Sequence, residues 1–126
     1  MCSEVVVGIV TKDQDILIVK RKEGEGHLRW QFPGGTLEEK ETDEQALLRE
    51  IKEETGCNIN IKKLLGQRIH PYTHKAMSYW ACEYIGGEIN ISDEDLEDAR
   101  WVNKFELTKY FTTSIFEPIL AYLDLI

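Results

Sequence analysis

The sequence predicts a layered domain of the α/β (α+β) class, and three features support this. Apolar, β-branched segments open the chain, an amphipathic helical segment follows a glycine pair, and apolar residues return at helical spacing near the C-terminus. Strands in several places, with two separate helices, pack as helices layered on a sheet. No repeat or low-complexity tract interrupts the pattern, so we expect residues 1–126 to form one domain.

The N-terminal part predicts a β-hairpin followed by a short extended segment. Residues 4–11 (EVVVGIVT) and 15–20 (DILIVK) are apolar and β-branched, with polar residues between them. The glycines of residues 23–26 (EGEG) predict a mobile loop. We expect residues 30–32 (WQF) to be extended, because Pro33 disfavours helix in the residue before it.

A helix is predicted over residues 43–55. Thr42 is a suitable N-cap, and Gln45, three residues later, completes a capping-box pattern. Gly56 suits the left-handed backbone position at which helices commonly end.

Three carboxylates share one side of this predicted helix. At about 100° per residue, Glu50, Glu53 and Glu54 fall within an arc of about 100°. Leu47 and Ile51 lie beside that arc and should enter the core. Like charges four residues apart destabilise a helix by about 0.2–0.5 kcal/mol. Without a cation, the pKa of one or more of these carboxyls should rise.

The segment after the helix predicts three further strands. Residues 58–65 form a strand candidate that ends at Gly66. Residues 67–70 and 77–84 predict two more strands, joined by a turn over residues 71–75.

The C-terminal part predicts a turn, a short strand and a second helix. A glycine pair at residues 86–87 marks the turn, and an acidic loop at 93–98 leads into a strand at 100–102. Residues 114–126 carry apolar side chains at helical spacing, and Pro118 fits the first turn of that helix.

Composition limits the classes of partner. The net charge is −8 and no block of Lys or Arg occurs, so a long nucleic acid is not an expected partner. A small anionic substrate remains compatible, since a divalent metal reverses the local sign of an acidic pocket. We expect no membrane association, because no apolar run approaches the roughly 20 residues of a span. A monomer or a homodimer is expected.

Cysteine usage and the first residues favour the cytoplasm. The chain begins without the positively charged region of a secretory signal, which leaves the cytosol as the expected compartment. Cys2, Cys57 and Cys82 are odd in number and far apart, so we expect no disulfide framework and no zinc spacing. Each is interpreted as a small buried or half-buried thiol.

The crowded carboxylates indicate a metal site. Mg²⁺ and Mn²⁺ prefer oxygen ligands, and Mg²⁺ usually keeps waters and binds substrate phosphates, so the trio suits either ion. The alternative is a solvated acidic helix face. That alternative does not require the neighbouring Gly34, Gly35, Arg49 and Gly56, so we favour the metal site.

The chain resembles the Nudix hydrolase superfamily over one run of fixed spacing: Gly35-x5-Glu41-x7-Arg49-Glu50-Ile51-x-Glu53-Glu54-x-Gly56-Cys57. The final position, where the family usually has Ile, Leu or Val, is here Cys57. The lead-in WQFPGG and the segment at 100–102 (RWV) look like the MutT-type branch. The resemblance implies a Nudix-like α/β/α sandwich, with a mixed β-sheet between helices.

The resemblance also implies roles for the matched positions. The metal ligands would be three box carboxylates and the carbonyl of a preceding glycine (Glu50, Glu53, Glu54 and Gly34). Glu53 or Glu50 would act as the general base on water. Glu41 and Arg49 would brace the loop and the helix, with Arg49 orienting a box carboxylate.

MutT-type members often add an acidic ligand from the loop before the last strand. Five residues compete for that role here: Asp93, Glu94, Asp95, Glu97 and Asp98. We prefer Asp95, by its distance from Trp101.

Substrate contacts are predicted near the ends of the first strands. In similar proteins a strand-end arginine contacts phosphates, which makes Arg21 a candidate; an exposed surface charge is the alternative. Phe32 is the best placed aromatic residue to stack on a base, ahead of Trp30 and Tyr72. The backbone at Gly35 can approach a ligand closely.

Other residues are given structural interpretations. His70 and His74 flank a turn without metal-binding spacing, and we interpret them as surface or hydrogen-bonded turn residues. Some MutT-type enzymes read oxidised guanine with an asparagine before the last helix, and residues 111–116 (FTTSIF) contain none. That absence counts against a role dedicated to oxidised guanine nucleotides.

The resulting hypothesis is a Mg²⁺-dependent MutT-like enzyme, in which Mn²⁺ can substitute. It would hydrolyse a nucleoside triphosphate to a nucleoside monophosphate and pyrophosphate. Alternatives within the family are a nucleotide sugar or a dinucleotide polyphosphate as substrate. Outside it, the alternatives are a non-catalytic nucleotide sensor and an acidic protein-interaction domain.

Overall fold

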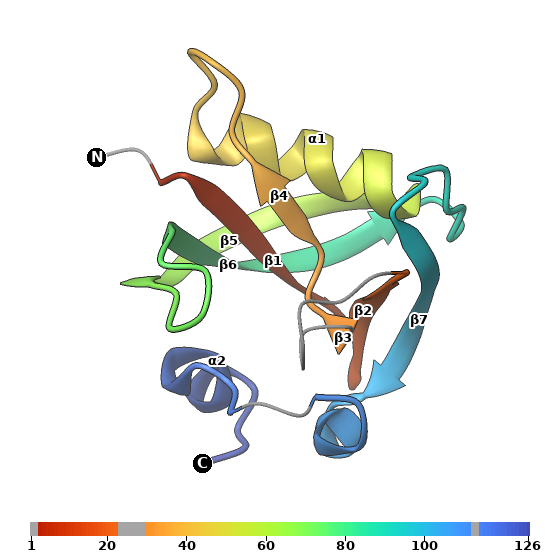
Figure 1. Ribbon diagram of the computed structural model, residues 1–126. Coiled ribbons are helices and arrows are strands. Elements are labelled where there is room, and N and C mark those ends of the chain that lie inside the picture. The colour runs from red at the N-terminus through yellow and green to blue at the C-terminus, as the bar shows by residue number, and fades with distance from the viewer. Residues whose placement is uncertain (1–2, 23–29, 112–113) are drawn as a thin grey trace.

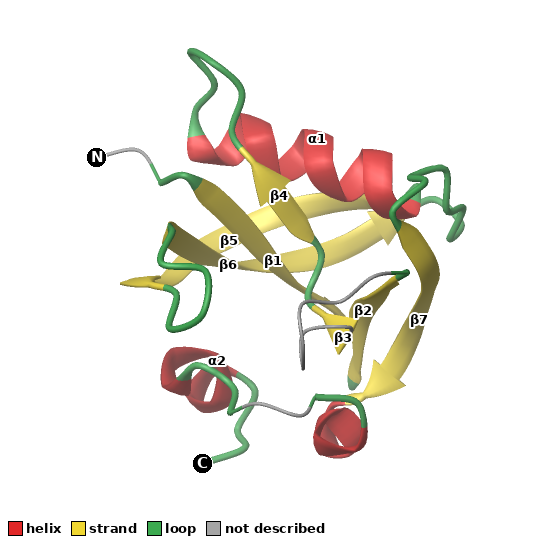
Figure 2. Cartoon of the chain, viewed as in Figure 1, coloured by secondary structure: helices red, strands yellow, loops and turns green. Residues whose placement is uncertain are grey.

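A seven-stranded mixed sheet lies between helices on its two faces in the computed structural model, which describes residues 3–22, 30–111 and 114–126. Helix α1 (Asp43–Thr55) covers one face, and helix α2 (Glu117–Tyr122) lies on the other (Figure 1, Figure 2). The predicted α/β/α sandwich is therefore confirmed. The remaining elements are β1 (Val5–Lys12), β2 (Asp15–Arg21), β3 (Trp30–Gln31), β4 (Gly34–Thr36), β5 (Asn58–Ile69), β6 (Ala76–Gly86), β7 (Leu96–Asn103) and the 3₁₀ helix η1 (Lys104–Lys109).

Strand β1 is central to the sheet. The strand order is β3-β2-β1-β6-β5, with β4 added beside β1 and β7 beside β2. β1 runs parallel to β6 and antiparallel to β2 and β4, so the sheet is mixed. Helices cover both faces of β1, and five of its residues in a row are buried, which explains its almost continuous apolar sequence.

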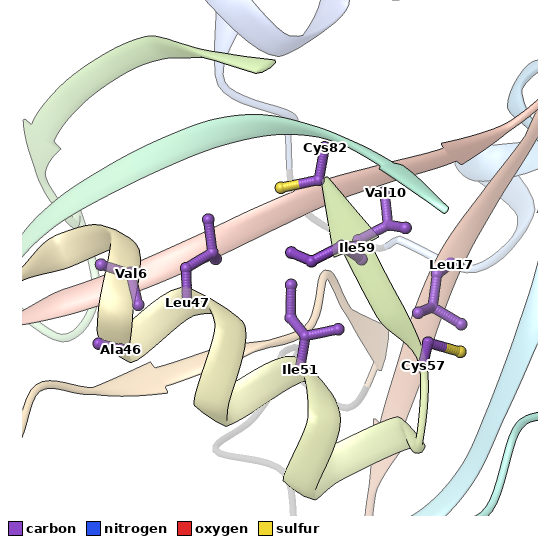
Figure 3. Close-up of a cluster of buried hydrophobic side chains, with 9 residues drawn as sticks. All are labelled: Val6, Val10, Leu17, Ala46, Leu47, Ile51, Cys57, Ile59 and Cys82. Atoms are coloured by element: carbon purple, nitrogen blue, oxygen red, sulfur yellow. The ribbon is translucent and has the colours of Figure 1, made fainter. Parts of the chain in front are cut away.

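The core consists of two main clusters, one on each side of the sheet. Val6 and Val10 of β1 pack with Leu47 and Ile51 of α1 (Figure 3). The alternate residues of β1 pack with Ile119 and Leu123 near α2, because successive side chains of a strand point to opposite faces. Cys57 and Cys82 are buried in the α1-side cluster, as predicted for small thiols.

Helix α1 begins and ends where the sequence predicts. Thr42 Oγ1 accepts a hydrogen bond from Gln45 N (3.1 Å), and Gln45 Oε1 accepts one from Thr42 N (3.0 Å). Gly56 has φ 78°, a left-handed conformation that costs a residue without a Cβ little. The orientation of its carboxylate arc is thereby fixed.

Strand β5 corrects one prediction. The sequence suggested two strands broken at Gly66, but β5 continues to Ile69 along β6. Irregularities in the β5–β6 register, one of them between Leu64 and Gly66, absorb the change without ending the strand. A Cβ at Gly66 would lie 3.0 Å from Phe116 Cε2, so glycine allows the strand to pack closely against Phe116.

The C-terminal part of the structure corrects two more predictions. The helix is shorter than the predicted span of 114–126, since it begins at Glu117 and ends at Tyr122. Helix η1 was not predicted; Asn103 Oδ1 caps it by accepting a hydrogen bond from Phe105 N (3.0 Å). The predicted mobile loop at 23–26 lies outside the described residues. No helix in the described ranges is long and apolar enough to cross a membrane.

Candidate active site

The three carboxylates of α1 share one arc but occupy different environments. Glu54 is buried, with 2% of its surface exposed, and Glu50 is half-buried. The side chain of Glu53 is 59% exposed. The difference arises because β4 runs alongside α1 and covers one edge of the arc (Figure 1). The arc therefore combines two partly desolvated carboxylates with one solvated carboxylate.

Glu54 is held by β4 and β2. Its Oε1 accepts a hydrogen bond from Gly34 N (2.9 Å), and its Oε2 lies 3.6 Å from Arg21 Nη2. Burial raises the pKa of Glu54 to about 7, although the Gly34 hydrogen bond and the Arg21 charge act in the opposite direction. A further cation next to Glu54 would stabilise its ionised form.

Glu50 lies directly against Gly35. A Cβ built at Gly35 would lie 2.3 Å from Glu50 Oε2, so a larger residue here would force this carboxylate to move. Burial raises the pKa of Glu50, and Arg49 partly offsets that effect. The predicted close approach at Gly35 is therefore an approach of backbone to a carboxylate.

Arg49 connects the loop after β4 to the helix. Its Nε and Nη2 donate to Glu41 (2.6 and 2.8 Å), and its Nη1 donates to Glu50 (2.7 Å) and Glu53 (3.2 Å). Its Nη2 also donates to the carbonyl of Thr36 (3.1 Å). The hydrogen bond from Arg49 lowers the pKa of Glu41 to about 2. The structure thus brings Glu41 and Arg49 together in the bracing arrangement that was predicted.

The acidic loop before β7 approaches the same carboxylates. The charge of Asp93 contributes to the raised pKa of both Glu50 and Glu54. Asp93 is half-buried, whereas Asp95, the residue preferred from sequence, is exposed and donates its backbone N–H to Asp93 Oδ1 (2.8 Å). The structure therefore favours Asp93 over Asp95 as the loop carboxylate whose charge acts on the site.

The donor set fits a hard divalent ion. In the described part of the chain, no group of three His, Cys, Asp or Glu side chains is already arranged to hold a metal. Mg²⁺ does not require such a cage, since it is usually held by one or two carboxylates, waters and substrate phosphates. Glu50 and Glu54 offer two carboxylates whose ionised forms are disfavoured by burial, Glu50 beside Gly35 and Glu54 beside Gly34.

A cavity of about 340 Å³ opens beside this site, on the α2 side of the sheet. Arg21 and Gly35 line its end near the carboxylates, and Phe32 forms part of its wall. The ring of Phe32 packs edge-on against Phe111, with 4.7 Å between centroids. The volume of the cavity lies in the range of small-molecule sites, roughly 300–1,000 Å³. All three residues predicted to contact substrate therefore line one cavity.

The cavity also contains residues that the sequence analysis did not select. Arg68 and Lys75 line it, as do His70 and Thr73 of the turn after β5. His70 Nδ1 accepts hydrogen bonds from the backbone of Tyr72 and Thr73 (3.1 and 3.2 Å), which confirms the hydrogen-bonded turn histidine. No local pattern marks Arg68, because its place depends on the register of β5 with β6.

Comparison with known families identifies the class. The NUDIX domain family matches residues 3–122, so the chain belongs to this family. The predicted membership of the Nudix hydrolase superfamily is thereby confirmed, and MutT proteins are among its structural relatives.

Particular relatives support the same assignment. An ADP-ribose pyrophosphatase from Methanocaldococcus jannaschii is 38% identical over 108 residues, which cover 82% of this chain and 63% of that protein. A NUDIX hydrolase from Nitrosomonas europaea superposes with a TM-score of 0.81 at 18% identity, over 98% of this chain and 72% of that one. A MutT structure from work on Aliivibrio salmonicida and Vibrio cholerae superposes with a TM-score of 0.70 at 24% identity, over 98% of this chain and 97% of that one. These last two show the fold.

Proposed function

We propose that this chain is a Mg²⁺-dependent hydrolase that cleaves the diphosphate linkage of a nucleoside triphosphate, releasing a nucleoside monophosphate and pyrophosphate. One observation carries the proposal: two desolvated carboxylates, Glu50 and Glu54, lie beside the Gly34–Gly35 backbone, and that backbone also lines a cavity with cationic and aromatic side chains. A phosphate chain could lie along that backbone, with the nucleoside in the cavity.

The ion would be held by Glu50 and Glu54, with Glu53, the Gly34 carbonyl and an acidic loop residue, Asp93 in preference to Asp95, as further ligands. When bound, the ion supplies positive charge for the phosphates and lowers the pKa of coordinated water. The desolvation of Glu50 and Glu54 supports their role, since a bound cation would stabilise the ionised forms that burial disfavours.

The protein's own groups would carry the remaining steps. Glu53 is the solvated carboxylate of the arc, and Arg49 binds its Oε2, which leaves Oε1 to accept a proton from water. The water oxygen then forms a bond to phosphorus, while the bond between that phosphorus and the bridging oxygen breaks. Attack at either the α- or the β-phosphorus yields the same two products. Arg21 would donate hydrogen bonds to phosphate oxygens.

A second candidate substrate is a nucleotide sugar such as ADP-ribose. The 38% identical relative carries that activity in its name. A second cavity of about 290 Å³, lined by Ser3, Glu4 and Leu37, adjoins the first and shares Val5, Thr36 and Lys75 with it. This space could accept a group on the far side of the diphosphate.

The test is a hydrolysis panel of nucleoside triphosphates, ADP-ribose and dinucleotide polyphosphates, with Mg²⁺ or with EDTA. We expect Mg²⁺-dependent release of a monophosphate from at least one substrate, and loss of it in Glu53→Gln. Glu44→Gln is the matched control, because Glu44 is exposed on the first turn of the same helix. Tight nucleotide binding without product under any metal would instead support the non-catalytic sensor.

A further inference from the structure

The cavity beside the carboxylates has a charge opposite to that of the protein. The chain carries a net charge of −8, yet none of the described residues that line the cavity is acidic. Three of them are cations: Arg21, Arg68 and Lys75. Arg21 is already paired with Glu54, whereas Arg68 and Lys75 form no ion pair within the described ranges. The part of the cavity that Arg68 and Lys75 line therefore offers positive charge and hydrogen-bond donors.

Arg68 is held in one orientation by aromatic residues. Its Nε donates to Tyr79 Oη (3.1 Å), and its Cζ lies 4.5 Å from the ring centroid of Phe116 and 5.4 Å from that of Tyr79. Those two rings also contact each other, with centroids 4.9 Å apart. Among described residues nothing accepts from Nη1 or Nη2, and neither is a buried unsatisfied atom. The outer fork of the guanidinium is thus available to a ligand.

The sheet places Arg68 three strands away from β4, which carries the Gly34–Gly35 end of the cavity. Thr36 of β4, Val5 of β1, Met77 of β6 and Arg68 of β5 lie side by side across four neighbouring strands. Three strand spacings of about 4.8 Å separate the Cα atoms of Thr36 and Arg68 by roughly 14 Å. Residues paired in this way share a face, and all four line the cavity.

We propose that Arg68 is a specificity-determining residue that recognises guanine: its Nη1 and Nη2 donate to O6 and N7 of the base. The inference rests on the proposed nucleotide substrate. Guanine presents two neighbouring acceptors on that edge, whereas adenine presents N7 beside an amino donor. Arginine has donors and no acceptor, so an amino group facing it gains nothing.

The polar neighbours of Arg68 support the same preference. Because His70 Nδ1 accepts from the backbone, the neutral ring carries its proton on Nε2 and can only donate from there. Lys75 is likewise a donor. Phe32 and Phe116 also line the cavity and add aromatic surface that could contact a base beside Arg68.

The test is calorimetric binding of GMP and of AMP to the full chain, which requires no turnover. We expect wild type to bind GMP roughly ten- to a hundredfold more tightly than AMP, as for one bidentate arginine–guanine pair. Arg68→Met keeps an apolar stem against Phe116 but has no donors, and should bring the ratio close to one. Arg68→Lys keeps the charge without the fork and should also lose most of the discrimination.

Two controls keep the result specific. Lys75→Met should weaken GMP and AMP binding by similar factors, and a thermal melt of each variant checks folding; Arg68→Gln replaces Arg68→Met if the latter does not fold. Equal affinity of wild type for GMP and AMP, or an unchanged ratio in the Arg68 variants, overturns the inference. A guanine preference that depends on Arg68, in a protein that hydrolyses nothing, would support the inference and contradict the proposed function.

Discussion

Replacing Glu54 with Gln should stabilise the metal-free protein at alkaline pH. Glutamine has nearly the same shape and keeps an oxygen that can accept from Gly34 N, where Glu54 now does so at 2.9 Å. It removes the charge that is buried in the α1–β4 contact. It also removes the ion pair with Arg21, which still hydrogen-bonds Gln31. The substitution therefore measures the net free energy of the ionised carboxylate at this site, which combines the cost of burial with the gain from the ion pair.

The sign and the magnitude follow from the pKa. Burial raises the pKa of Glu54 from 4.5 to about 7, so the folded protein binds this proton more tightly than the unfolded chain. Folding then takes up a proton between these pH values, and the free energy of unfolding falls as pH rises through that window. One pKa unit corresponds to about 1.4 kcal/mol, so the loss between pH 5 and pH 8 amounts to about 2–3 kcal/mol.

The assay is urea denaturation followed by tryptophan fluorescence, at pH 5 and pH 8, with EDTA or with Mg²⁺. In EDTA, wild type and Glu54→Gln should have similar stability at pH 5, and the variant should be more stable by about 2–3 kcal/mol at pH 8. Mg²⁺ should stabilise wild type at pH 8 much more than the variant. A variant that is less stable than wild type at pH 8 in EDTA would refute the reasoning, because Glu54 would then contribute as a favourable ion pair.

Four further outcomes follow from the same structure. Arg49→Met removes the hydrogen bonds that hold two box carboxylates. Because a small misplacement of a reacting group can lower a rate about a hundredfold, kcat in steady-state assays should fall by about that factor. Gly35→Ala places a Cβ 2.3 Å from Glu50 Oε2 and should lower kcat/KM similarly, with circular dichroism unchanged. Ile51→Ala should lower the free energy of unfolding by about 2–5 kcal/mol in urea titrations. Burial raises the pKa of Cys82 to about 12, so iodoacetamide at pH 8 should leave this thiol unlabelled until urea unfolds the protein.

The sequence was sufficient for the features that depend on neighbouring residues. The capping box at Thr42, the left-handed Gly56 and the carboxylate arc are all set by spacing along one helix. The hairpin of β1 and β2 likewise follows from two apolar segments joined by a short polar turn. These features could be predicted because a few bonds along the chain determine them.

The remaining features depend on distant segments. Glu54 is buried and Glu53 is exposed because β4 covers Glu54. The spacing of residues along α1 does not reveal this contact. Arg68 reaches the cavity only because β5 continues past Gly66 in register with β6. Asp93 acts on the box carboxylates instead of Asp95 because of how the loop before β7 folds. Sequence spacing alone could not choose between those two residues.

The most direct test of the metal site is anomalous diffraction from crystals soaked in Mn²⁺. The proposed chemistry predicts a manganese peak within coordination distance of the Glu50 and Glu54 carboxylates, and no such peak in Glu54→Gln crystals. A wild-type crystal with no peak at these carboxylates, from a preparation that hydrolyses nucleotides in Mn²⁺, would contradict the proposed metal site.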